Sequence, residues 1–117
     1  MTRRVERPWG HEEIWAETDR YVGKILCINS GHKLSLQHHE VKDETIRMLQ
    51  GTMDLLIEDD QGAMQTLRMT PGMTAHIAPH RKHRMVAVTD VELVEVSTPE
   101  LDDVVRHQDA YGRSDAS

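Results

Sequence analysis

The sequence has little of what defines several common protein classes. Its 117 residues contain one cysteine, no phenylalanine, two tryptophans and two tyrosines. A single cysteine cannot form an internal disulfide, and Cys27 lies between Leu26 and Ile28, where a small buried residue is expected. Because aromatic residues are so few, the hydrophobic core must consist mainly of Leu, Ile, Val and Met.

An excess of positive charge and long apolar stretches are also lacking. Fourteen Lys and Arg residues against twenty Asp and Glu residues give a formal net charge of -6. This balance disfavours nucleic acid as a partner. No apolar run follows the basic residues 1–8, and none is long enough to cross a membrane. We therefore expect a soluble cytoplasmic protein with a single domain over residues 1–117.

Short segments with strand character recur along the chain and alternate with turn signals such as Ser30-Gly31 and Pro71-Gly72. These segments are residues 13–16, 21–29, 33–37, 45–49, 53–58, 65–69, 74–78, 84–88 and 92–97. Many short, evenly spaced strands are typical of a β-sandwich or barrel. The pattern predicts an all-β barrel over about residues 12–98.

The end of the chain has a different pattern. Thr98 could act as the N-cap of a helix whose first residue is Pro99, and Leu101, Val104 and Val105 follow. We therefore predict a short C-terminal helix and a polar tail within residues 99–117.

Residues 37–44 and 80–83 contain the side-chain types that bind metals. On a strand, alternate residues face the same side, so Gln37 and His39 are expected to point into the barrel while His38 points away. Glu44 begins the next strand and His83 precedes a later one, so both could complete the site. Amide, imidazole and carboxylate ligands suit a first-row divalent metal such as Zn, Mn, Fe, Co or Ni.

The spacing of these residues resembles the two motifs of the cupin superfamily. Gly31, five residues, Gln37-x-His39, four residues, Glu44, six residues and Gly51 resembles the first motif, with Gln where the commonest form has His. Gly72, five residues and then Ala78-Pro79-His80-Arg81-Lys82-His83 resembles the second. The resemblance implies a cupin double-stranded β-helix, which is a jelly-roll barrel.

Residues outside the motifs resemble one branch, the type II mannose-6-phosphate isomerase domain. The matching segments are Arg7-Pro8-Trp9-Gly10, Leu34-Ser35-Leu36-Gln37, Lys42 with Glu44, His83-Arg84, Asp102-Asp103-Val104-Val105-Arg106 and Tyr111-Gly112-Arg113. In larger proteins that domain is often fused behind a mannose-1-phosphate guanylyltransferase. The resemblance covers nearly the whole chain.

This resemblance implies roles for individual residues. It assigns the metal to Gln37, His39, Glu44 and His83. Lys42, where the isomerases usually carry Arg, and Arg113 are implied in handling a sugar phosphate.

Other residues could take part in substrate binding and proton transfer. Arg84 and Arg113 suit phosphate contact because a guanidinium matches phosphate oxygens. His80, which replaces the usual Gly of the second motif, could border the mouth of the pocket and bind substrate, or it could be only a turn residue. The general base stays open among Glu44, His38, His80 and Lys42.

Three functions compete at this stage. An isomerase acting on a sugar phosphate such as mannose 6-phosphate explains most of the sequence. A non-haem iron oxygenase is the alternative, because His39, Glu44 and His83 form a set of two histidines and one carboxylate. A non-catalytic module that binds a small molecule is the third. For each function we expect a homodimer, since pairing would cover exposed strands.

Overall fold

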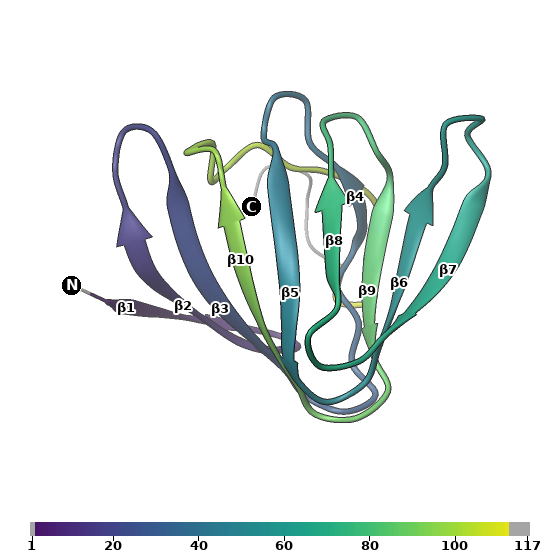
Figure 1. Ribbon diagram of the computed structural model, residues 1–117, viewed down its shortest axis with the longest axis horizontal. Coiled ribbons are helices and arrows are strands. Elements are labelled where there is room, and N and C mark those ends of the chain that lie inside the picture. Colours follow the sequence, from purple (N-terminus) through teal and green to yellow (C-terminus); the bar gives the residue numbers. More distant parts are fainter. Residues whose placement is uncertain (1, 113–117) are drawn as a thin grey trace.

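The computed structural model describes residues 2–112, which form eleven strands in two antiparallel sheets and no helix. One sheet has the order β1-β2-β3-β10-β5-β8 and the other β11-β4-β9-β6-β7, and the two enclose a common interior (Figure 1). The strands are β1 Arg3–Arg7, β2 Gly10–Glu17, β3 Val22–Ile28, β4 Leu36–His38, β5 Glu44–Gln50, β6 Met53–Glu58, β7 Met64–Met69, β8 Thr74–Ile77, β9 His83–Ala87, β10 Val91–Ser97 and β11 Val105–Gln108.

The prediction of an all-β architecture is confirmed, and each predicted segment overlaps a strand from β2 to β10. The additional strand β1 has the sequence RRVER, which lacks apolar alternation, and it forms by pairing with β2. Cys27 was expected in the core, but it lies on the outward side of β3 and is only half-buried. Strand alternation accounts for this, since the flanking Leu26 and Ile28 both face inward and are buried.

The predicted C-terminal helix is wrong for the described residues 99–112. Residues 99–104 form turns, and β11 then pairs antiparallel with β4, with Val105 opposite His38. The hydroxyl of Thr98 accepts the backbone N–H of Asp43, so it does not cap a helix. A helix of about two turns is marginal alone, and pairing with the open edge of β4 outweighs the local signal. Residues 113–117 of the predicted tail lie outside the described residues.

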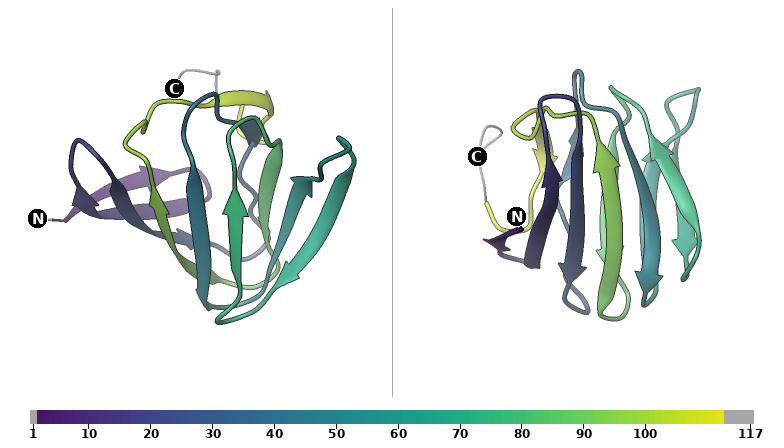
Figure 2. Two further views of the ribbon diagram at one scale, coloured as in Figure 1. Left: turned by 45° about the horizontal axis from the view of Figure 1, so that its top comes forward. Right: turned by 60° about the vertical axis from the view of Figure 1, so that its left-hand side comes forward.

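The chain after β10 crosses over one end of the barrel before it reaches β11 (Figure 2). This crossing segment, residues 98–104, closes one side of the pocket described below. None of the described residues forms a helix that could span a membrane.

The interior has two parts that differ in composition. An apolar core fills one part, and its buried members are Trp9, Leu26, Ile28, Ile46, Met48, Met53, Leu55, Met69, Ile77, Met85, Ala87, Val91 and Leu93. The same strands carry charged residues at other inward positions, for example Lys24 two residues before Leu26 and Glu95 two residues after Leu93. The fold therefore places a polar pocket directly beside an aliphatic core.

Candidate metal centre

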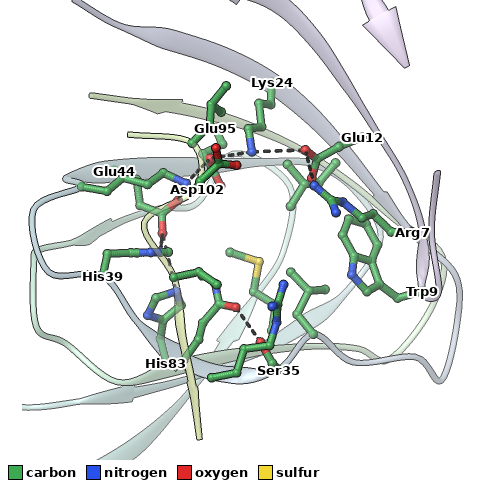
Figure 3. A pocket seen from close by; sticks show the side chains of 18 residues that line it. Arg7, Trp9, Glu12, Lys24, Ser35, His39, Glu44, His83, Glu95 and Asp102 are labelled. Atoms are coloured by element: carbon green, nitrogen blue, oxygen red, sulfur yellow. Dashed lines mark hydrogen bonds and ion pairs between the residues drawn. The ribbon is translucent and has the colours of Figure 1, made fainter. Parts of the chain in front are cut away.

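A pocket lies between the two sheets beneath residues 98–104 (Figure 3). Both sheets and the crossing segment contribute to it. Its lining residues are Arg7, Trp9, Glu12, Lys24, Leu26, Leu34, Ser35, Gln37, His39, Lys42, Glu44, His83, Met85, Glu95, Leu101, Asp102, Val104 and Arg106.

Three buried ligand types converge in this pocket. His39 follows β4, Glu44 opens β5 and His83 opens β9. Glu44 Oε1 lies 3.0 Å from His39 Nε2 and 3.5 Å from His83 Nε2. The three ligand atoms all lie within 4.8 Å of one another, and no residue of the three is more than 3% exposed. We call His39, Glu44 and His83 the inner triad.

Backbone carbonyls orient both imidazoles of the inner triad. His39 Nδ1–H donates to the carbonyl oxygen of Asp103 at 2.5 Å, and His83 Nδ1–H donates to that of Arg81 at 2.9 Å. In a neutral imidazole the other nitrogen then carries a lone pair, and in both residues that nitrogen faces Glu44. Within the described residues, His83 Nε2 is buried and has no hydrogen-bond partner. A buried acceptor without a partner is rare, and a cation at this position would satisfy it.

The protonation states of His83 and Glu44 also suit a metal. Burial lowers the pKa of His83, which favours the neutral imidazole. Burial alone would raise the pKa of Glu44, but the contact with the His39 imidazole and the Lys42 charge hold that pKa well below its ordinary value. The pocket thus presents a neutral His83 imidazole and an ionised Glu44 carboxylate, the forms in which these groups bind a metal.

The structure brings Gln37 to the same pocket. Gln37 on β4 lies opposite His83 on β9 in the strand pairing. The Gln37 Oε1 atom accepts a hydrogen bond from the Ser35 hydroxyl at 2.6 Å. A carbonyl oxygen has two lone pairs, so this bond leaves one acceptor position. A ligand role for Gln37 stays a prediction.

A row of buried charges extends from the inner triad across the sheet. Lys42 Nζ lies 3.6 Å from Glu44 Oε2 and 3.3 Å from Glu95 Oε2. Lys24 Nζ continues the row, 4.0 Å from Glu95 Oε2 and 3.2 Å from Glu12 Oε1. Figure 3 shows Glu12, Lys24 and Glu95 along one wall of the pocket. Each ammonium in the row therefore lies between two carboxylates.

The charges of this row strongly influence one another. Burial, together with the negative charge of Glu44, raises the pKa of Glu95 to about 7. Burial would lower the pKa of Lys42, but the charges of Glu95 and Glu44 raise it above its ordinary value. Lys42 is therefore a cation held by two carboxylates of the pocket wall.

Motif spacing and family resemblance did not point to Glu12, Lys24 and Glu95, although a signal for two of them was present. On β3 and β10 the inward positions alternate, so Lys24 shares a face with Leu26, and Glu95 shares one with Leu93. A charged residue in phase with buried aliphatic residues indicates a polar pocket.

Other predicted site residues lie elsewhere. Arg84 is not among the lining residues: its Nε donates to the carbonyl oxygen of Leu34 at 2.9 Å, and its Nη2 donates to that of Gln108 at 3.1 Å. His80 is exposed, and its Nδ1 lies 3.3 Å from Glu40 Oε2. Arg113 lies outside the described residues.

Two other guanidinium groups line the pocket instead, those of Arg7 and Arg106. Arg7 pairs with Glu12 at 3.3 Å, and its side chain is one-third exposed. Both residues belong to segments that carried the family resemblance, so their position in the pocket could have been suspected.

The family model described as Mannose-6-phosphate isomerase C-terminal matches residues 1–109. The chain belongs to this family. It is 32% identical to the mannose-1-phosphate guanylyltransferase of Escherichia coli over 95% of the chain and 23% of that protein. It is 30% identical to the xanthan biosynthesis protein XanB of Xanthomonas campestris over 96% of the chain and 24% of that protein. The chain therefore spans about a quarter of the length of these relatives.

Solved structures support the cupin fold of this family member. KdgF from Halomonas superposes with a TM-score of 0.71 at 22% identity, covering 87% of this chain and 88% of that one. Oxalate decarboxylase from Bacillus subtilis superposes with a TM-score of 0.80 at 14% identity, covering 91% of this chain and 30% of that one. The resemblance of the sequence to a cupin of the mannose-6-phosphate isomerase type is thus confirmed.

Proposed function

We propose that this chain is a metal-dependent isomerase that interconverts an aldose phosphate and a ketose phosphate, with mannose 6-phosphate as the first substrate to test. The observation that carries the proposal is the inner triad with its unpartnered His83 Nε2, buried in a pocket lined by further charged residues. Gln37 would be the fourth metal ligand. Family membership supports the choice of substrate class.

The charge of the pocket favours an anionic ligand once a metal is bound. The described lining residues include four basic side chains, Arg7, Lys24, Lys42 and Arg106, and four acidic ones, Glu12, Glu44, Glu95 and Asp102. These formal charges cancel, so a divalent cation would make the pocket positive. A phosphate ester carries about -1.5 to -2 charges at neutral pH. We assign phosphate contact to Arg7 and Arg106, because the lysines are buried between carboxylates.

A divalent metal bound here would polarise the carbonyl oxygen and the adjacent hydroxyl of the sugar. The chain must then move a proton between two neighbouring carbons. Glu95 is a pocket carboxylate outside the inner triad, and it shares the Lys42 ammonium with Glu44. We assign proton transfer to Glu95 and the positioning of its carboxylate to Lys42.

The proposal is tested by incubating the metal-loaded protein with mannose 6-phosphate and detecting fructose 6-phosphate in a coupled assay. We expect turnover that a chelator abolishes and that His83→Ala lacks. His32→Ala is the matched control, because His32 contacts Tyr111 and does not line the pocket. Absence of turnover, together with no thermal protection by the sugar phosphate, would overturn the proposal.

The composition of the inner triad favours one second candidate, a non-haem iron oxygenase, because two histidines and one carboxylate are the ligand set of such enzymes. Metal analysis after purification without added metal separates the two. Bound iron with oxygen consumption supports the oxygenase, whereas zinc, manganese or cobalt with sugar-phosphate turnover supports the isomerase. Thermal protection without turnover would indicate the third function, a binding module.

The expected homodimer can be tested by light scattering.

A further inference from the structure

A second cluster of metal-ligating side chains lies outside the pocket. His38, Glu40 and His80 each offer a ligand atom, and these atoms all lie within 4.8 Å of one another. Glu40 joins the two imidazoles: its Oε1 lies 2.9 Å from His38 Nε2, and its Oε2 lies 3.3 Å from His80 Nδ1. From this geometry we infer that His38, Glu40 and His80, here called the outer triad, form a second binding site for a divalent transition metal of the zinc class.

The position of His38 resembles that of a metal ligand. Its Nδ1 lies 2.8 Å from His107 Nε2 on β11, while its Nε2 faces Glu40. Metal-binding histidines generally donate their second ring N–H to a neighbouring group, which fixes the ring and directs the lone pair at the metal. A neutral His38 has one N–H for these two contacts. If that N–H donates to His107, a cation between His38 Nε2 and Glu40 Oε1 satisfies both lone pairs.

The distances suit a tetrahedral ion. Metal–ligand bonds of about 2.0–2.1 Å at tetrahedral angles place neighbouring ligand atoms about 3.3 Å apart. His80 Nδ1 lies 3.3 Å from Glu40 Oε2, which already has this value, and His38 Nε2 lies 2.9 Å from Glu40 Oε1, which is slightly shorter. The two imidazoles thus approach different oxygens of one carboxylate, and an ion bound by one of these oxygens needs the carboxylate to rotate. The Glu40 side chain is 54% exposed, so a small rotamer adjustment would open that gap. Water would complete the coordination on this open surface.

The backbone holds His80 beside Glu40. His80 has a φ of 71°, and it is the one residue other than glycine with a positive φ in the part of the chain that the structure describes. Its backbone N–H donates to the carbonyl oxygen of His39 at 2.7 Å. This bond fixes the turn to the end of β4, so His80 is presented by ordered backbone rather than by a free loop.

The outer triad is distinct from the inner triad. His38 ends β4 and His39 follows it, but only His39 lines the pocket, and no outer ligand does. The inference therefore does not depend on the proposed isomerase function.

The test is equilibrium dialysis of the full chain against Zn²⁺, with metal and protein measured in the retained fraction. We expect the wild type to retain one equivalent more than His80→Gly, and the residual outer affinity of the variant to be at least about tenfold weaker. Glycine adopts a positive φ freely, so this variant is expected to fold. The expected difference of one equivalent holds whether or not the inner triad binds metal.

The matched control is His76→Ala. His76 is also an exposed histidine paired with a carboxylate, Asp43 at 2.6 Å, but it belongs to no group of three ligands among the described residues. We expect it to retain as much zinc as the wild type. In a second arm, His83→Ala should keep the outer equivalent, and addition of His80→Gly should remove it. Equal zinc retention by the wild type and His80→Gly would overturn the inference.

Discussion

The inner and outer triads contain the same residue types, two histidines and one glutamate, and they differ in burial. His39, Glu44 and His83 are at most 3% exposed, whereas the side chains of His38, Glu40 and His80 are 16%, 54% and 69% exposed. Water can satisfy the outer ligands when no metal is present, but it is largely excluded from the inner ones. Residue composition therefore defines which metals a site can bind, while burial decides how strongly the stability of the protein depends on the bound metal.

The largest effect on metal binding is expected from His83→Ala, which removes one ligand of the inner triad. Zinc binding to four-ligand sites is worth about 10–16 kcal/mol, so losing one ligand should weaken the inner metal about a hundredfold or more. We expect His83→Ala and His39→Ala each to lose most inner metal on dialysis. His32→Ala should retain it. Equal retention in all three variants would contradict the inner assignment.

The next largest effect is expected from Lys42→Met, which removes one cation of the buried row. Lys42 lies between Glu95 and Glu44, so the variant leaves two buried carboxylates without their shared partner. Breaking a buried pair in this way costs about 3–5 kcal/mol. The loss in free energy of unfolding is measured by urea unfolding of the metal-free protein at neutral pH. Arg68→Met is the control: it breaks the exposed Arg68–Asp54 pair, where little change is expected. A similar free energy of unfolding for Lys42→Met and Arg68→Met would show that burial does not set the contribution of these ion pairs.

Glu95→Gln tests the same region by its pH dependence. The pKa of Glu95 is raised from 4.5 to about 7, so the folded state binds its proton more tightly than the unfolded state does. This contribution to stability is fully present below pH 4.5 and is lost as the pH rises through 7, by up to about 3 kcal/mol. Relative to the wild type, metal-free Glu95→Gln should therefore gain stability between pH 5 and pH 8. Groups that do not contact Glu95 titrate alike in both proteins and cancel in the difference, so parallel pH profiles in urea unfolding would refute the shift.

The smallest effect concerns the outer triad. His80 adopts a positive φ, which costs a residue with a side chain about 1–2 kcal/mol. His80→Gly removes this backbone strain, but part of the gain in stability is offset because glycine increases the conformational entropy of the unfolded chain. His80→Gly should thus stabilise metal-free protein by about 0.5–1 kcal/mol in thermal or urea unfolding. Saturating zinc should reverse this order, because it stabilises the wild type through the outer site. If His80→Gly remains more stable than the wild type in saturating zinc, the outer triad binds no metal.

Much of the fold follows from local patterns. Period-two alternation and glycine-containing turns identified the strands from β2 to β10, because a half-buried strand must alternate in order to bury one face. The two ends of the chain resisted prediction. Strand β1 has no apolar pattern, and β11 follows a segment that reads locally as a helix start. Both strands form because a neighbouring edge offers backbone hydrogen bonds, which single-segment patterns cannot reveal.

The site divides in the same way. Strand alternation separated His39 from His38, and motif spacing added three further candidates. The structure places all four predicted ligands in one pocket, namely Gln37, His39, Glu44 and His83. The row formed by Glu12, Lys24 and Glu95 escaped because its members are far apart in sequence. Arg84 was expected near phosphate, yet its guanidinium donates to the backbone carbonyl oxygens of Leu34 and Gln108.

Strand period and motif spacing are local properties of the chain, so they were enough to establish the all-β class, the family and the side chains that meet in the inner triad. Only the tertiary structure decided which charges share the pocket and which histidines form the outer triad. Those contacts join β4 to the turn before β9 and β2 to β10. The partners of the charge row come from neighbouring strands of one sheet, and their energies depend on a burial that exists only once the two sheets have closed around their common interior.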